Sequence, residues 1–327
     1  MNAKWVQPDV RDAVVAFVER WSGVAGQRDA WFCRKLGIRP GRLVEWRVRM
    51  GLPNAHNAMS PRDFWLTSEE RRLIVEYYRA HGMDGYRRCA YMMIDEDVVY
   101  ASPSTVYRVL RDAMAIRPHG GKASKKGSGF EQPLRPHEQW HTDISYVKVG
   151  DVFFFLICVL DGHSRFIVSW DMRGAMTDKD VGMVVQKAVE AFPGERPRVI
   201  TDNGKQFVGK EFKEFIGIHG LTHTRTSVNY PQSNGKIERF HKTIKSECVR
   251  KRAIVDLDHA REVLSPYVEH YNHKRLHSAI SYVAPADRLH GRDVAVLAER
   301  DRKLEAARAR RREANRTLAE NKECVLT

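Results

Sequence analysis

Cysteine is scarce in this sequence, with five among 327 residues, and none belongs to a C-x-x-C pair. The five, which lie far apart, are Cys33, Cys89, Cys158, Cys248 and Cys324. This spacing gives no readable disulfide framework or cysteine zinc site, and it fits a reducing compartment. Long apolar runs are also missing: no stretch approaches the roughly 18 apolar residues of a membrane span, and the N-terminus lacks the apolar core of a signal peptide. We therefore expect a soluble, cytoplasmic protein with no membrane partner.

Acidic residues are outnumbered by basic ones. Lys and Arg total 55 against 41 Asp and Glu, which gives a net charge of +14 and a pI near 9.6. A charge of this sign indicates a polyanionic partner, and nucleic acid is the leading candidate. A basic but otherwise ordinary enzyme is the alternative, because net charge bears on association and not on fold. The length indicates two or three domains.

The first 58 residues read as a helical DNA-binding domain. Between residues 10 and 50, apolar residues at helical spacing predict three short helices. Gly37, between Leu36 and Ile38, can supply the sharp turn of a helix-turn-helix unit. The third helix would present four arginines to DNA, namely Arg39, Arg42, Arg47 and Arg49. A generic three-helix packing unit remains the alternative.

Residues 59–116 predict a second helical, helix-turn-helix-like unit. Thr67 to Glu70 is a capping signature that opens one helix. Ser102 and Pro103 are suited to open another, whose outward residues Tyr107, Arg108 and Arg111 are candidates for DNA contact. An ordinary amphipathic helix that does not contact DNA would have the same pattern. The Gly, Ser, Pro and Lys content of residues 117–137 predicts a flexible basic linker.

Residues 138–252 predict a mixed α/β domain with the order βββαβα. Three residues carry its chemistry: Asp143 inside the first strand, Asp202 at the end of a later strand, and Glu238 early on a helix. The expected strands are 140–149, 152–160, 165–170, 198–201 and 221–224, with helices over 177–191, over 209–218 and from about residue 235.

The three acids are consistent with a metal site. A carboxylate inside an apolar strand is costly to bury without a counter-ion. Hard divalent cations such as Mg²⁺ take oxygen ligands from a few carboxylates, and two such ions can assist in-line displacement at phosphorus. Taken singly, each acid also fits a surface strand, turn or helix position.

The sequence motifs around these acids resemble those of the integrase catalytic core, the ribonuclease-H-like fold of retroviral integrases and insertion-sequence transposases. They are WHTDISY at Asp143, TDNGKQF at Asp202 and SNGKIERFHKTIK at Glu238. Tyr271-Asn272, RLHSA from Arg275 and Ala284-Pro285 resemble the transposase C-terminal segment, and the resemblance covers about residues 61–290. Residues 253–290 are then a helical extension of the core. The charged composition of residues 291–327 predicts a solvated helical tail, for which DNA and a second subunit are candidate partners.

The resemblance implies a five-stranded mixed sheet and a DNA transposase. Asp143, Asp202 and Glu238 would bind two Mg²⁺ ions, which Mn²⁺ can replace, and the enzyme would cleave DNA and join element ends to target DNA. Lys242 would face the donor DNA end, with Lys236, Arg239 and Lys245 as further contacts. Residues lining the target or terminal-base path would be Asn203, Gln206, Tyr230 and Asn234.

The resemblance has one departure, because retroviral integrases carry an N-terminal His and Cys zinc domain that is missing here. The motif most similar to the histidine pair of that zinc domain is His137-x-x-x-His141, and it lacks a cysteine pair. The helix-turn-helix start instead resembles bacterial mobile-element transposases, in which it recognises element ends. A homo-oligomer of at least two subunits on double-stranded DNA in the bacterial cytoplasm is implied, and an ATPase helper cannot be read from the sequence. The competing hypotheses are a DNA-binding regulator without catalysis and a nuclease that hydrolyses without joining.

Overall fold

In the computed structural model, the described residues are 6, 8–52, 65–116, 132–226 and 234–324. The chain forms two compact units, Met1–Glu70 with Glu305–Thr327, and Arg71–Leu304. Helix α4 (Ser68–His81) and helix α13 (Asp293–Cys324) each have residues in both units. No helix in the described part of the chain combines the length and apolar character needed to cross a membrane.

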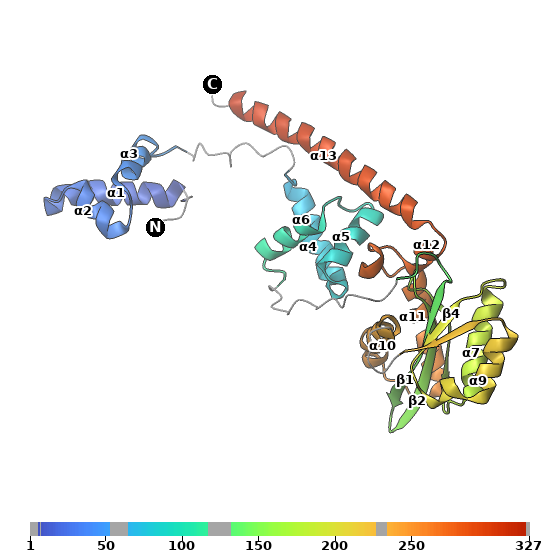
Figure 1. Cartoon of the computed structure of the whole chain (residues 1–327). Helices are drawn as coiled ribbons and strands as arrows, with labels where there is room; N and C mark the ends of the chain where they lie inside the picture. The colour runs from blue at the N-terminus through green and yellow to red at the C-terminus, as the bar shows by residue number, and fades with distance from the viewer. Residues whose placement is uncertain (1–5, 7, 53–64, 117–131, 227–233, 325–327) are drawn as a thin grey trace. The chain divides into compact units, whose positions relative to one another are not determined.

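The first unit contains the predicted three-helix arrangement: α1 (Pro8–Ala25), α2 (Asp29–Leu36) and α3 (Pro40–Val48) (Figure 1). Gly37 ends α2 with φ 66°, a left-handed conformation that favours glycine, and its N–H bonds the carbonyl of Cys33. The predicted turn is therefore confirmed. The three helices enclose a small apolar core, which consists of Val15, Val18, Phe32, Cys33, Ile38, Leu43 and Trp46.

The predicted cap at the start of α4 is also confirmed. The N–H of Thr67 donates to Glu70 Oε2 at 2.9 Å, and the N–H of Glu70 donates back to Thr67 Oγ1 at 3.2 Å. These reciprocal bonds satisfy two backbone donors that the helix leaves unpaired. In the same unit, Arg311 of α13 donates to both Glu70 carboxylate oxygens, and its side chain is only 8% exposed.

The second unit opens with helices: the end of α4, a short 3₁₀ turn (Gly82–Asp84), α5 (Tyr86–Asp95) and α6 (Pro103–Asp112). Ser102 caps α6 as predicted, because its Oγ accepts a hydrogen bond from the N–H of Thr105. The first half of α13 packs here, where Arg300 makes two hydrogen bonds to Asp95 at 2.7 and 2.6 Å. The tail helix therefore differs from the solvated helix that its composition predicts.

A five-stranded mixed sheet forms the rest of the second unit, as the sequence predicts. Its order is β3-β2-β1-β4-β5, with β1, β2 and β3 antiparallel and with β4 and β5 parallel to β1. The strands are β1 (Gln139–Val149), β2 (Val152–Asp161), β3 (Ile167–Arg173), β4 (Arg198–Thr201) and β5 (Thr222–Arg225). Of the predicted linker, residues 117–131 lie outside the described residues.

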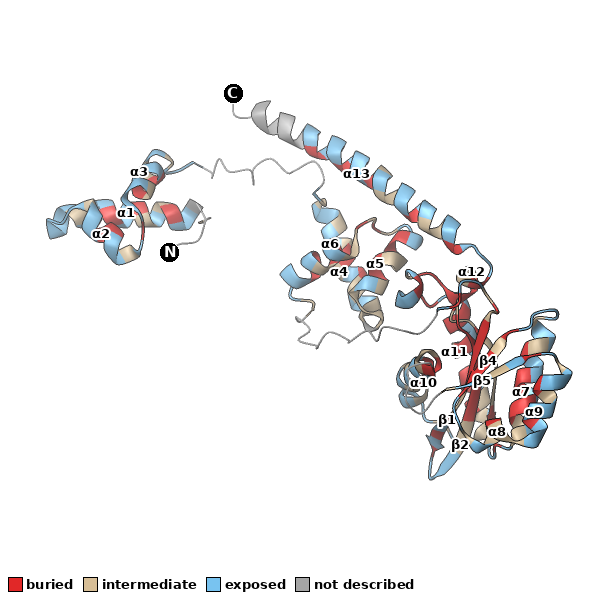
Figure 2. Cartoon of the chain, viewed as in Figure 1, coloured by how far each residue is buried: buried red, intermediate tan, exposed pale blue. Residues whose placement is uncertain are grey.

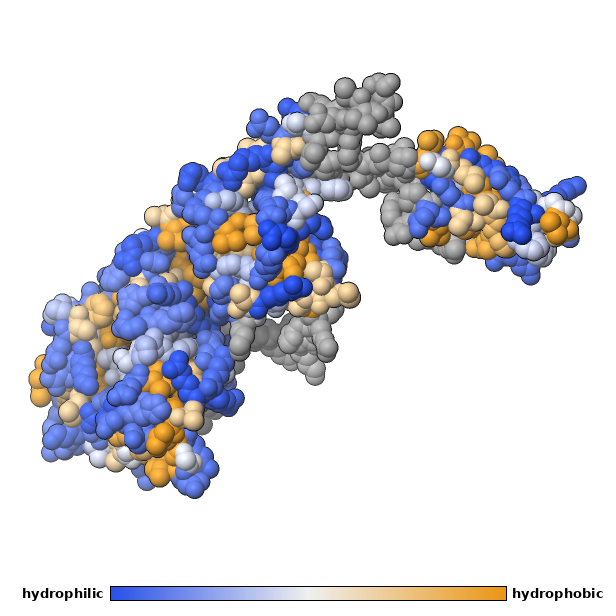
Figure 3. Space-filling model, turned by 180° about the vertical axis from the view of Figure 1, so that it is seen from behind, coloured by the Kyte–Doolittle hydropathy of each residue, from blue (hydrophilic) through white to orange (hydrophobic). Residues whose placement is uncertain are grey.

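Helices cover both faces of this sheet, and Figure 2 shows the buried residues concentrated between the layers. One face packs against α7 (Asp178–Ala191) and α9 (Lys210–Ile218), with the short α8 (Lys205–Val208) beside them. The other packs against α10 (Gly235–Glu247) and α11 (Leu257–His273). The chain then passes through 3₁₀ turns at Val249–Lys251 and Ser278–Ile280 and through α12 (Pro285–Leu289). The face of the second unit seen in Figure 3 is largely hydrophilic, with smaller apolar patches.

Candidate functional site

The parallel pairing of β1 with β4 brings two of the predicted acids together. His141 pairs with Ile200, so Asp202, two residues beyond Ile200, lies level with Asp143, two residues beyond His141. Burial raises the pKa of Asp202; the Gly204 N–H, 2.9 Å from Oδ1, lowers it, and the nearby Asp143 charge raises it again, with a net increase. Asp143 and Asp202 therefore share one electrostatic environment at the end of β4.

The third acid lies on the helix that crosses β1. Glu238 is exposed in the first turn of α10, while Ile237, Phe240 and Ile244 pack the helix onto the sheet. One turn further on, the His241 Nδ1 lies 3.3 Å from Asp143 Oδ2. Residues three apart on a helix lie on the same side, so Glu238 is one turn from the residue that contacts Asp143.

The three carboxylates do not form a closed cluster. Within the described residues, no group of three or more His, Cys, Asp or Glu side chains is placed so that it could hold a metal ion. Residues 227–233, which lead into α10 and include Tyr230, lie outside the described residues. The structure therefore brings Asp143 near Asp202 and into contact with His241, and Glu238 lies one turn before His241 on α10.

Two of the four basic α10 candidates are exposed, and two are tied into the fold. Arg239 and Lys242 are exposed. Burial lowers the pKa of Lys245, with a further lowering by Arg250 that Asp143 partly opposes. Lys236 donates from Nζ to the carbonyl of Gly162 at 3.0 Å, and burial lowers its pKa to about 7. This backbone bond gives Lys236 a partner inside the protein.

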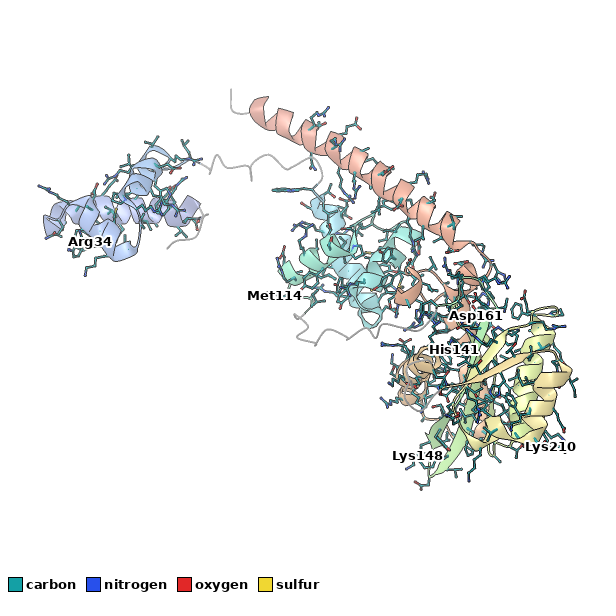
Figure 4. The ribbon with its side chains drawn as sticks, viewed as in Figure 1. Arg34, Met114, His141, Lys148, Asp161 and Lys210 are labelled. Atoms are coloured by element: carbon teal, nitrogen blue, oxygen red, sulfur yellow. The ribbon has the colours of Figure 1, made fainter. Side chains whose placement is uncertain are left out.

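A group of buried polar side chains surrounds the start of β1. Among the described residues, neither ring nitrogen of His141 has a hydrogen-bond partner, and burial lowers the pKa of His141 to about 3. Figure 4 shows His141 toward the opposite end of β1 from Lys148. Further buried atoms without a partner belong to Gln139, Thr142, Asn234 and His241. Sequence reasoning missed the role of His241, although its spacing of three from Glu238 was a usable signal.

Of the other candidates for the target or terminal-base path, Asn203 has a local partner. Asn203 Nδ2 donates to the carbonyl of Thr226 at 2.8 Å. Gln206 is half-buried and Asn234 is buried. The His137 ring accepts a hydrogen bond from Trp140 Nε1 at 3.2 Å on Nδ1, so that nitrogen is already occupied.

The four arginines near the first unit's α3 fall into two pairs. Arg39 is exposed just before the helix, and the Arg42 guanidinium lies 5.2 Å from the centroid of the Trp46 ring. Arg47 instead forms ion pairs with Asp29 and Glu19, and Arg49 lies 3.4 Å from Glu45. The acids hold the second pair within the domain.

The α6 candidates lie along one helix of the second unit. Tyr107 packs beside Tyr86, with ring centroids 5.1 Å apart. Arg108 and Arg111 are exposed, with local partners in Thr105 Oγ1 at 3.2 Å and Asp112 at 3.1 Å.

Comparisons with known proteins agree with the fold. Residues 133–231 and residues 219–285 each match a family model described as integrase core domain. The transposase for insertion sequence element IS904 of Lactococcus lactis is 27% identical over 50% of this chain and 69% of its own length. The transposase for IS629 of Shigella sonnei is 21% identical over 78% of this chain and 89% of its own.

Among solved structures, the simian T-cell lymphotropic virus intasome in complex with PP2A regulatory subunit B56 gamma covers 66% of this chain and 74% of its own, at 18% identity and a TM-score of 0.45. Likeness at this level is too low to bear on function. The two family matches together take in the sheet, Asp143, Asp202 and Glu238, and the relatives are transposases. Residues 133–285 therefore form an integrase core domain similar to that of insertion-sequence transposases, a family of DNA transposition and integration.

Proposed function

We propose that the chain binds the ends of a mobile element and catalyses metal-dependent DNA cleavage and strand transfer through Asp143, Asp202 and Glu238. One observation carries this proposal: the β1–β4 register sets Asp143 level with Asp202, beside the helix that bears Glu238. An α/β sheet generally holds its ligands beyond the carboxyl ends of its strands, which is where Asp202 lies.

The donor set fits Mg²⁺, because all three side chains offer carboxylate oxygens and none offers a thiolate. The metal ions would polarise the attacking and leaving oxygens at phosphorus. Through its contact with Asp143, His241 would keep that carboxylate oriented.

The same site would serve two reactions. Water as the nucleophile forms a new P–O bond while the bond to the 3′-oxygen breaks, which cleaves the strand and frees a 3′-hydroxyl. That hydroxyl then attacks a target phosphodiester, forms a new P–O bond and displaces a target 3′-oxygen. No nucleophilic side chain is needed, so Asp143, Asp202 and Glu238 bind and orient throughout.

DNA itself would be held by the basic residues that remain accessible. These are the exposed residues Arg39 before α3, Arg108 and Arg111 of α6, and Arg239 and Lys242 of α10. The other candidates would contribute less, because they are partly buried: Arg42, Arg47, Arg49, Tyr107, Lys236 and Lys245. Joining requires two element ends together, so the active form would be at least a dimer.

The test is joining of a labelled element-end duplex to plasmid DNA with Mg²⁺ or Mn²⁺. Asp202→Asn and Glu238→Gln should abolish joined products while end binding is retained. Asp258→Asn, an exposed acid of α11, is the matched control and should join at the wild-type rate. End binding without chemistry in the wild type would favour a regulator, and cleavage without joining would favour a nuclease.

A further inference from the structure

A cavity of about 830 Å³ lies at the end of the sheet opposite Asp202. Three arginines line it, Arg135, Arg196 and Arg198, together with Thr222, Glu138 and Glu195. Arg198 and Thr222 are the first residues of β4 and β5, so the cavity is open where these parallel strands begin. None of the residues proposed above to contact DNA lines this basic cavity.

The two glutamates of the cavity do not neutralise its three arginines to the same extent. The Glu138 carboxylate accepts backbone N–H bonds from Leu134 and Arg135 at 2.9 and 3.3 Å. Those two backbone hydrogen bonds lower the pKa of Glu138 and stabilise its ionised carboxylate. Arg196 donates to the backbone carbonyl of Glu195 at 2.8 Å. Among the described residues, the guanidinium of Arg198 makes no hydrogen bond or ion pair, although its charge helps to lower the pKa of Glu138, so it can take an anionic partner.

An exposed strand edge connects this cavity to the carboxylates. Among the described residues, β5 is the last strand of the sheet, and its outer edge presents N–H groups that no described strand pairs with. Thr222, Thr224 and Arg225 are exposed along it, while His223 turns inward to Thr201 Oγ1 at 2.9 Å. The edge is polar and ends on a cation, in contrast to an apolar docking surface.

The length of this edge fits DNA. From Arg198 to Asp202 is four residues, or about 13 Å at roughly 3.3 Å per residue. Successive base pairs of B-DNA advance about 3.4 Å, so the separation matches about four base-pair steps. Hydroxyls, backbone N–H groups and arginines are the donors that commonly bind DNA phosphates.

We propose that the β5 edge and the arginine cavity form a phosphate-binding track that holds the DNA backbone about four base pairs from the scissile phosphate. The inference rests on the proposed strand-transfer function. It adds a second point of contact at the end of the sheet opposite Asp202. Two separated contacts fix the direction of a duplex, whereas one contact at the carboxylates leaves it free to pivot.

The experiment measures binding of a fluorescently labelled element-end duplex by anisotropy between 50 and 200 mM salt. Arg198→Gln should reduce the salt-dependence exponent by about 0.9, so that affinity falls about threefold less across this range. Arg302→Gln is the control, because Arg302 is exposed on α13 and paired with Glu299. Equal exponents for the two variants would overturn the proposal.

A variant of opposite sign guards against loss of folding as an explanation. Glu195→Gln removes a negative charge from the exposed rim of the cavity, so it should tighten duplex binding severalfold. Unchanged or weaker binding would contradict the track. A duplex shortened to end fewer than four base pairs beyond the cleavage site should bind wild type and Arg198→Gln alike, and a persisting difference would place the contact elsewhere.

Free anions separate a DNA track from a site for small phosphates. Inorganic phosphate or ATP, compared at equal ionic strength with sodium chloride, should displace the duplex no better than chloride. Specific displacement that Arg198→Gln abolishes would instead identify a free-phosphate or nucleotide site and overturn the DNA assignment. If the wild-type protein joins DNA and all cavity variants behave as Arg302→Gln, only the phosphate-binding track is refuted. If the wild-type protein neither binds nor joins DNA, the proposed function itself is refuted.

Discussion

The Glu247–Arg275 pair is predicted to hold α10, and with it Glu238, against the rest of the catalytic core. Glu247 ends α10, and its carboxylate accepts hydrogen bonds from Arg275 Nε at 2.8 Å, Arg275 Nη2 at 2.5 Å and the Tyr267 hydroxyl at 2.9 Å. The Arg275 side chain is 8% exposed and that of Glu247 is 32% exposed. Glu247→Gln keeps the shape and removes the charge, so a largely buried guanidinium loses its counter-ion.

The expected cost follows from that burial. Breaking a buried ion pair by removing one partner costs about 3–5 kcal/mol. Because Glu247 is a third exposed and the glutamine oxygen can still accept one bond, we expect the lower end, about 3 kcal/mol. Hydrogen exchange of the α10 amides should then be faster by a factor on the order of 100. Glu269→Gln, an exposed acid of α11, is the matched control.

The pair also makes a signed prediction about pH. Burial acts to raise the pKa of Glu247, but the bonds and charge of Arg275 outweigh it, so the pKa lies below the usual 4.5. A lowered folded-state pKa gives stability that is present above 4.5 and is lost as pH falls through the folded value. Wild-type protection of α10 should therefore drop in this acidic window more than that of Glu247→Gln. If the α10 amides of Glu247→Gln and Glu269→Gln exchange at the same rate at neutral pH, the Glu247–Arg275 pair does not hold α10 in place.

Three smaller changes test local structure. Gly37→Ala should destabilise the first unit by about 1 kcal/mol, because φ is 66° there; an unchanged thermal midpoint would argue against the turn. Ser102→Ala should cost about 1 kcal/mol by removing the α6 cap, seen as faster exchange of the first α6 amides and absent for Ser104→Ala. Arg311→Gln should leave Glu70 without its paired cation and speed proteolysis within residues 305–317; cleavage at the wild-type rate would mean that the pair does not hold the tail.

Much of the fold could be predicted because local patterns and final packing agree. The strand over 198–201 and the cap at Ser102 are found where the sequence places them. The third strand begins at Ile167 and not at Arg165, because Ser164 and Arg165 close a turn onto Asp161. Helix α5 was missed, although Cys89, Ala90 and Met93 lie at helical spacing on its buried side.

The parts that could not be predicted depend on partners distant in the sequence. Arg300 is buried by its bonds to Asp95, and nothing in the composition of the tail marks it as different from its exposed neighbours. Arg47 has the spacing of a DNA contact, yet Asp29 occupies it. Motif words located Asp143, Asp202 and Glu238, whereas the contact between His241 and Asp143 arises from helix packing.

The most direct test of the proposed metal-binding role is a change of metal preference at Asp202. In Asp202→Cys, a soft thiolate replaces a hard carboxylate at the end of β4, and thiolates bind Mn²⁺ better than Mg²⁺. We expect this variant to lose strand joining with Mg²⁺ and to recover part of it with Mn²⁺, while Asp258→Cys joins equally with both. Joining by Asp202→Cys at the wild-type rate in Mg²⁺, or equal loss with both metals, would contradict it.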